Sequence, residues 1–198
     1  TYSQSGEAQA QAMLNDLAVH PATARHVATK LARHFAADDP PPALAARLEQ
    51  AFLSSGGDLP TLYRVLIAAP EVWDGKPKFR SPWEWAIAIL RATGVKRLPG
   101  ASAAGAFQQL GQPIWKPGSP AGYDDTAPSW AGPDALYRRV EVAQRIAQRT
   151  APSIDARQLA ARLFPGALSQ STSDALARAE SGEQALALLL SSPEMMRR

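Results

Sequence analysis

The chain has 198 residues, enough for one sizeable hydrophobic core or two small ones, and its hydrophobic fraction of 45% is ordinary for a folded globular protein. Its formal net charge is only +3 and its basic residues are spread along the sequence, so we predict no nucleic-acid partner. The absence of cysteine excludes disulfides, thiolate metal sites and cysteine nucleophiles.

The sequence contains no apolar run that approaches the roughly 20 residues needed to cross a bilayer, so we predict no membrane span. Its polar start, TYSQSGEAQAQ, lacks the basic region and the apolar region that follow one another in a signal peptide. Because the chain lacks an initiator Met and leads almost at once into a helical pattern, we expect it to be a processed or truncated piece of a longer protein.

Apolar residues recur at helical spacing in the first part of the chain. They predict helices over Glu7–Val19, over His20–Phe35, from Ala43 to the glycines at 56 and 57, and from an Asp58 cap to about Ala69. In the second of these helices, the predicted docking face for the core consists of Ala24, Val27, Ala28, Leu31 and Phe35.

A basic stretch with Lys76, Lys78 and Arg80 leads into the sequence Ser81-Pro82-Trp83-Glu84, which has the pattern of a capping box. This pattern predicts a helix that runs to about Thr93 and ends at Gly94. Trp83 and Trp85 could form an aromatic wall for a sugar or peptide. Successive helical residues point about 100° apart, however, so we expect one indole in the core and the other at its edge.

Residues 98–133 are dense in Gly and Pro and predict a long ordered loop, with a short helix around Ala101–Leu110. Flexible linkers seldom carry large apolar side chains, and this segment has Trp115, Tyr123 and Trp130. We therefore expect the loop to pack across helices.

From Pro133 the helical pattern returns, with a predicted apolar face made of Leu136, Val140, Ala143 and Ala147. The arginines of this helix, at 138, 139, 145 and 149, fall mostly off that face. Shorter helices are predicted around Asp155–Phe164, Ser173–Glu180 and Glu183–Ser191, the last with a capping-box pattern at Ser181–Gln184.

No segment alternates with the period of a strand, so the predicted fold is all-α: a compact bundle of about eight or nine helices with one long ordered loop rich in Gly and Pro. We expect a single domain over residues 1–198. It would consist of a helical first half at 1–97, the loop at 98–133 and a helical second half at 134–198.

The loop also holds most of the candidate ligand-binding residues, because amide, aromatic, cationic and carboxylate groups come together on irregular backbone. They are Gln112, Trp115, Lys116, Tyr123, Asp124 and Asp125. The adjacent acids could serve acid–base chemistry or bind a divalent cation, or they could simply belong to a solvated turn, with the whole loop a structural brace.

Among the three histidines, His20 is the further candidate, because it stands at a predicted helix start, where it could cap the helix or bind an anion. His26 and His34 lie about 12 Å apart along one helix, with no acid in that helix to complete a metal site. We predict no metal site and no cofactor.

Five blocks in order resemble the C-terminal half of the bacterial domain of unknown function 1800 family. They are HPATARHVATKLARHFAADDPPPALAARL, GGDLPTLYRVLIAAPEVW, KFRSPWEWAIAILRATG, LGQPIWKPGSPAGYDDTAPSW and LALLLSSPEMMRR. The resemblance implies a mainly helical protein, often exported, with an N-terminal half absent here and genes for sulfatase-like exported proteins nearby. It implies no catalytic residues.

The resemblance slightly favours an exported or periplasmic location, and the residues also allow a cytoplasmic one. The sequence contains no G-x-S-x-G, Walker-type, H-E-x-x-H or G-x-G-x-x-G pattern and assigns no reaction. We predict a scaffold or partner-binding module of a larger protein, with the N-terminal half or an exported sulfatase-like protein as its partner. The alternative is half of a hydrolase-like or carbohydrate-acting site, completed by the N-terminal half.

Overall fold

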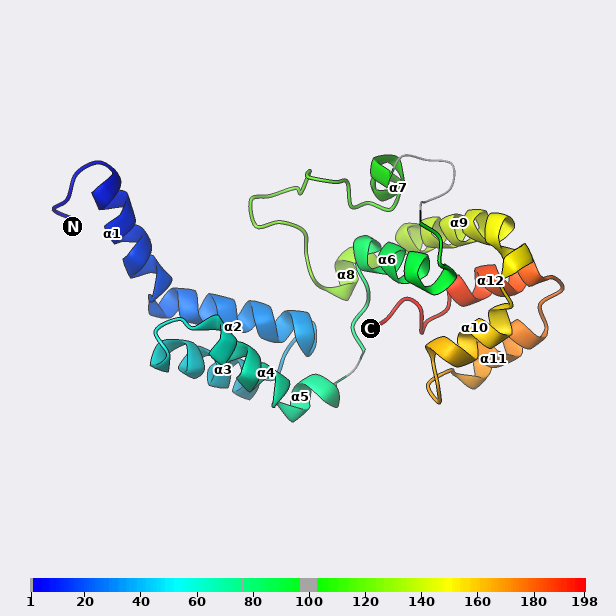
Figure 1. Ribbon diagram of the computed structural model, residues 1–198, viewed down its shortest axis with the longest axis horizontal. Helices are drawn as coiled ribbons and strands as arrows, with labels where there is room; N and C mark the ends of the chain where they lie inside the picture. Colours follow the sequence, from blue (N-terminus) through cyan, green and yellow to red (C-terminus); the bar gives the residue numbers. More distant parts are fainter. Residues whose placement is uncertain (1, 76, 97–102) are drawn as a thin grey trace. The chain divides into compact units, whose positions relative to one another are not determined.

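A computed structural model describes residues 2–75, 77–96 and 103–198 of the chain (Figure 1). These residues form twelve α-helices and a short 3-10 helix; they form no strand, although Phe79 and Arg197 make an isolated antiparallel bridge. The predicted all-α fold is confirmed. Contacts divide the chain into two compact units, Thr1–Pro77 and Lys78–Arg198, and each is described by itself. The single domain expected from the sequence stays a prediction.

The first unit consists of five helices among the described residues, and the first four begin close to their predicted starts. They are α1 (Glu7–Ala18), α2 (Pro21–Phe35), α3 (Pro42–Ser54), α4 (Leu59–Ile67) and α5 (Pro70–Trp73). The predicted cap of α4 is confirmed, since the Asp58 carboxylate accepts a hydrogen bond from the Thr61 amide at 3.0 Å. Helix α5 was not predicted, because four residues are too few to show a helical period.

The core of the first unit forms where α2 packs against α3 and α4. Ala24, Ala28 and Ala32 are fully buried along one row of α2, and these small side chains let the neighbouring helices approach closely. The prediction that Phe35 belongs to this face was wrong, because its side chain is 47% exposed. The buried row continues through Ala36, and Phe35 points about 100° away from it.

The second unit holds the remaining helices. They are α6 (Pro82–Thr93), α7 (Ala103–Gln109), α8 (Ala127–Trp130), α9 (Pro133–Thr150), the 3-10 helix η1 (Ala151–Ser153), α10 (Ala156–Leu163), α11 (Gln170–Ala177) and α12 (Gly182–Leu190). The predicted start of α7 near residue 101 lies outside the described residues. Helix α12 is central, since α9, α10 and α11 all contact it and four of its side chains, Ala185, Leu186, Leu189 and Leu190, are buried.

Two of the predicted helix ends can be compared directly with the structure. The capping box of α6 is confirmed in both directions between Ser81 and Glu84, and Gly94 ends the helix in the left-handed region at φ 71°. In α12 only half of the predicted box forms. The Ser181 hydroxyl accepts from the Gln184 amide, but the Gln184 side chain accepts from the Glu180 amide and not from Ser181.

Helix α9 buries a face that only partly overlaps the predicted one. Its buried side chains are Arg139, Val142, Ala143, Ile146 and Ala147, while Val140 is exposed and Leu136 is half-buried. Ala143 and Ala147 of the predicted face are buried and Leu136 packs against the core, so only the placement of Val140 on that face was wrong. The aromatic rings of Phe79 and Trp85 supply the physical reason, because they lie beside the Arg139 guanidinium and allow a charged residue to enter the core.

Glu194 connects the end of the chain to the start of α11. Its carboxylate accepts hydrogen bonds from the Ser169 amide at 2.9 Å and from the Thr172 hydroxyl at 2.9 Å. Partial burial acts to raise the pKa of this carboxyl, but hydrogen bonds from Ser169, its own amide and Thr172 outweigh burial and lower the pKa from 4.5 to about 2. The charged form of Glu194 therefore stabilises the folded state.

Replacing Glu194 by Gln removes this charge, and we expect a loss of about 1–2 kcal/mol of folding free energy at pH 7, allowing for solvent screening. Because the folded pKa lies below the unfolded one, the contribution is present above pH 4.5 and is lost as the pH falls towards 2. Urea unfolding at several pH values measures the difference. The exposed Glu180→Gln is the control, and a deficit that stays constant down to pH 2 would contradict the explanation.

Candidate functional site

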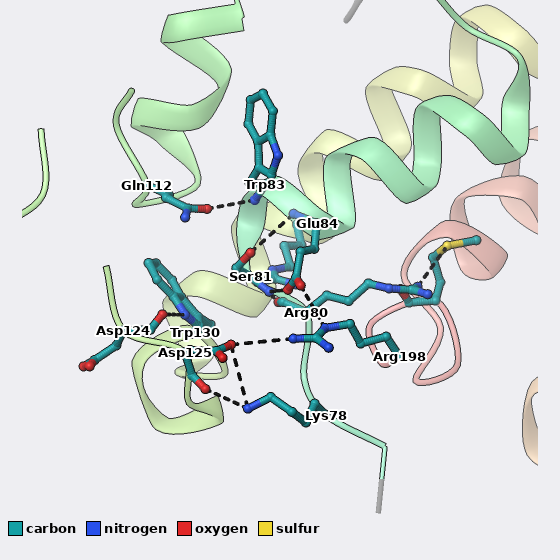
Figure 2. Close-up of polar contacts among 12 residues, drawn as sticks. Lys78, Arg80, Ser81, Trp83, Glu84, Gln112, Asp124, Asp125, Trp130 and Arg198 are labelled. Carbon is teal, nitrogen blue, oxygen red and sulfur yellow. Dashed lines mark hydrogen bonds and ion pairs between the residues drawn. The ribbon is translucent and has the colours of Figure 1, made fainter. Parts of the chain in front are cut away.

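The loop between α7 and α9 is attached to the start of α6 through Gln112. The Gln112 side-chain oxygen accepts a hydrogen bond from the Trp83 amide at 2.8 Å (Figure 2). This amide belongs to the first turn of α6, where backbone donors have no partner within the helix. The Trp83 ring lies against Phe107 of α7 at 4.8 Å between centroids. Gln112 thus caps a helix and joins the loop to it.

Tyr123 and Asp124 make contacts within the loop and with α8. The Tyr123 hydroxyl donates to the Pro113 carbonyl, and its ring lies 6.0 Å from that of Trp130. The Asp124 carboxylate accepts from the Ser129 hydroxyl at 2.8 Å, and its carbonyl accepts from the Trp130 indole at 2.9 Å. These bonds fold the loop back on itself.

Asp125 lies beside two cations (Figure 2). They come from the first and the last residue of the second unit, Lys78 and Arg198. Lys78, whose side chain is almost fully buried, donates to the Asp125 carbonyl at 2.8 Å and lies 3.8 Å from its carboxylate. Arg198 lies 3.7 Å from the same carboxylate and forms an ion pair with Glu84 of α6 at 2.8 Å. The buried Lys78 charge is balanced there by a charged partner and a carbonyl, as a buried ammonium requires.

The backbone next to these cations is paired with the last residues of the chain. The Lys78 amide donates to the Arg198 carbonyl and the Arg198 amide donates to the Lys78 carbonyl, both at 2.9 Å. The Arg80 amide donates to the Met196 carbonyl at 2.8 Å, and the Arg80 guanidinium donates to the Met195 carbonyl at 2.5 Å. Residues 78–80 and 195–198 therefore hold each other in place.

Arg139 lies behind this pairing, inside the core. It donates one hydrogen bond to the Arg80 carbonyl at 2.8 Å, and its guanidinium carbon lies 4.7 Å from the Phe79 ring centre and 5.5 Å from that of Trp85. Its other terminal nitrogen, Nη1, is buried and has no hydrogen-bond partner among the described residues. Burial lowers the pKa of Arg139 to about 10 and also lowers that of Arg80, against an ordinary value of 12.5.

Trp115 and Lys116 extend into solvent from this anchored loop. The Trp115 side chain is 94% exposed, and its backbone has φ 57°, in the left-handed region that a bulky residue seldom adopts. Lys116 is also exposed. His20 belongs to the first unit, where its Nδ1 accepts from the Ala22 amide at 3.1 Å and caps α2. Its expected capping role is confirmed.

The predicted residues therefore make separate contacts and do not converge on one site. Gln112, Tyr123, Asp124 and Asp125 hold the loop in place, and Trp115 and Lys116 face solvent. Trp85 is buried and Trp83 is half exposed at the edge of the core, as predicted. Across the described residues, no three His, Asp or Glu side chains are placed to hold a metal ion. In the same part of the chain, no helix is long and apolar enough to span a membrane.

The comparison with known families agrees with the resemblance seen in the sequence. The chain matches the family described as "Protein of unknown function (DUF1800)" over residues 1–197. The chain belongs to this family. No curated protein and no solved structure matches it significantly. Membership in the DUF1800 family thus supplies no reaction, and the contacts within the chain have to carry any functional argument.

Sequence reasoning missed Arg198, which pairs with Asp125 of the loop, and Arg139, which holds the segment at Arg80. It also missed the ion pair that Glu84 makes with Arg198 in addition to its capping role. Lys78 and Arg80 were noted as a basic stretch with Lys76, which lies outside the described residues. The available signal was the aromatic–basic sequence Lys78-Phe79-Arg80 directly before a capping box. Such a sequence is typical of an ordered segment, but it does not indicate which residues the segment contacts.

Removing either of the two adjacent acids of the loop between α7 and α9 should change the free energy of unfolding by different amounts. Asp125→Ala takes a carboxylate away from a buried lysine, and we expect a loss of about 1–3 kcal/mol in the free energy of unfolding. Asp124→Ala removes one exposed hydrogen bond to Ser129 and should cost less than about 1 kcal/mol. Urea unfolding followed by circular dichroism measures both. Equal losses would mean that the ion pairs of Asp125 do not hold the loop.

Proposed function

We propose that this DUF1800 chain is a partner-binding helical module of a larger protein, and that the loop between α7 and α9 carries its contact residue. The observation that carries the proposal is Trp115, an almost fully exposed indole in a loop that hydrogen bonds hold on both sides of it. Ile114 beside it is 39% exposed, and Lys116 follows with a positive charge.

An indole in water and a bulky residue at positive φ are both unfavourable in free energy, by roughly 1–3 kcal/mol each. The surrounding hydrogen bonds of Gln112 and Tyr123 hold the loop in this conformation. A preorganised loop loses little entropy on binding, and Trp is enriched among the residues that dominate the binding energy of protein interfaces. These properties support a role for Trp115 as an anchor that enters a pocket on a partner.

The partner we propose is the N-terminal part of the longer protein implied by the family resemblance. An exported sulfatase-like protein, which the resemblance also implies, is the second candidate. Trp115 and Ile114 favour an apolar pocket on the partner, and Lys116 favours an acidic rim around it.

The alternative of a shared hydrolase-like or carbohydrate-acting site has less support. Such a site needs polar groups available to a substrate, whereas the oxygens of Gln112 and Asp124 and the hydroxyl of Tyr123 already hydrogen-bond within the chain. The Asp125 carboxylate is held by two cations. These groups act as braces in the free chain, which favours the binding role.

The test is a calorimetric titration of the separately expressed N-terminal part into this chain. We expect Trp115→Ala to weaken binding at least about 30-fold, because truncating an anchor residue at an interface costs 2 kcal/mol or more. The matched control is Trp73→Ala, which removes another exposed indole, from the first unit. This control should retain the wild-type affinity within about threefold.

Trp115 has little contact with the chain itself, so Trp115→Ala should unfold at the same temperature as the wild type. An unchanged unfolding temperature with lost binding would support the anchor role. Two results would contradict the proposal: no heat of binding with the N-terminal part, or equal affinity of Trp115→Ala and the wild type.

A further inference from the structure

A pocket of about 490 Å³ lies on the second unit, and none of the residues that brace the loop lines it. Its walls come from three elements: the last turn of α6, the segment at and after η1, and one face of α10. The volume lies within the range of pockets that bind small molecules. Its residues took no part in the site described above.

Three of the residues that line this pocket are apolar. Leu159 of α10 is buried, and Ala92 and Ile154 are half-buried and pack against the core of the second unit. The apolar side chains belong to the core, so they are held by contacts on their other sides. These side chains can contact a small hydrocarbon or aromatic group.

Two guanidinium groups belong to the same pocket. Arg91 comes from the last turn of α6 and Arg162 from the last turn of α10. Neither has a hydrogen bond or an ion pair with another described residue. Two unpaired arginines in one pocket attract an anion, and the planar guanidinium fits a carboxylate through two parallel hydrogen bonds.

The one acid of the pocket does not cancel this charge. Asp155 caps α10, and its carboxylate accepts from the amides of Arg157 at 2.9 Å and Gln158 at 3.2 Å. The Thr93 hydroxyl is also occupied, since it donates to the Ile89 carbonyl at 2.8 Å. The pocket therefore keeps an excess of one positive charge, with both cationic groups available to a ligand.

We infer that this pocket binds a small organic carboxylate with a flat or short apolar body. The carboxylate lies between Arg91 and Arg162, and the apolar body lies on Leu159, Ile154 and Ala92. This inference is independent of the proposed partner contact at Trp115, because the two regions share no residue.

Benzoate is the probe, and benzamide is its uncharged counterpart of nearly the same shape. The measurement is a titration of the full chain followed by amide NMR shifts. We expect benzoate to shift the amides of Gly94 and Ile154 with a millimolar Kd, and benzamide to bind at least about tenfold more weakly. Arg91→Ala and Arg162→Ala should each weaken benzoate binding by about tenfold.

Arg149→Ala is the matched control, since it removes an arginine that does not line the pocket, and it should bind benzoate as the wild type does. Arg91 and Arg162 are exposed, so their variants should fold normally, and Arg91→Gln provides a milder change. The inference would be overturned by equal binding of benzoate and benzamide, by equal weakening in Arg149→Ala, or by no saturable shift of the pocket amides.

Discussion

The buried charge of Arg139 is the constraint around which the second unit is organised. A guanidinium with almost no exposed surface loses its hydration, which is why its pKa falls to about 10, yet it stays charged at neutral pH. The rings of Phe79 and Trp85 and the Arg80 carbonyl replace part of the lost water. Segment 79–80 therefore has to lie directly over α9.

The position of segment 79–80 over α9 determines which backbone groups beside it need hydrogen-bond partners. Its neighbouring amides and carbonyls need partners, and residues 196–198 supply them. That pairing brings Arg198 to Glu84 and Asp125, and Lys78 to Asp125. The loop is thus fixed to α6 and to the chain end by charges whose positions depend on one arginine of α9.

This dependence explains what could and could not be predicted from the sequence. Helices α2, α3 and α6 carry both a clear apolar period and a cap or a proline at their start, so their bounds were predicted closely. Local patterns decide such features. In α9 four arginines share the helix, and only contacts with residues about 55–60 positions earlier in the chain select Arg139 for burial. No local rule identifies it.

The candidate site shows the same limit. Sequence reasoning located the loop and its polar residues, but it treated nearness along the chain as nearness of the functional groups. Asp124 and Asp125 are adjacent, and yet one bonds to α8 while the other meets cations from both ends of the unit. Neighbouring loop residues can point in different directions. The partners of Asp125 lie 47 and 73 positions away along the chain, so a local sequence pattern cannot predict them.

The contacts that occupy these polar groups also bear on function. A loop with unpaired acids could adapt to a substrate. A loop whose acids are paired keeps a fixed shape, and only its side chains without such contacts are available to a partner. Here the most exposed apolar side chain of the loop is the Trp115 indole, at 94% exposure, on backbone that an unbraced loop would not favour. The buried arginine and the exposed tryptophan are therefore linked: the charge in the core stabilises the segment that holds the loop, and the loop holds Trp115 away from its own protein.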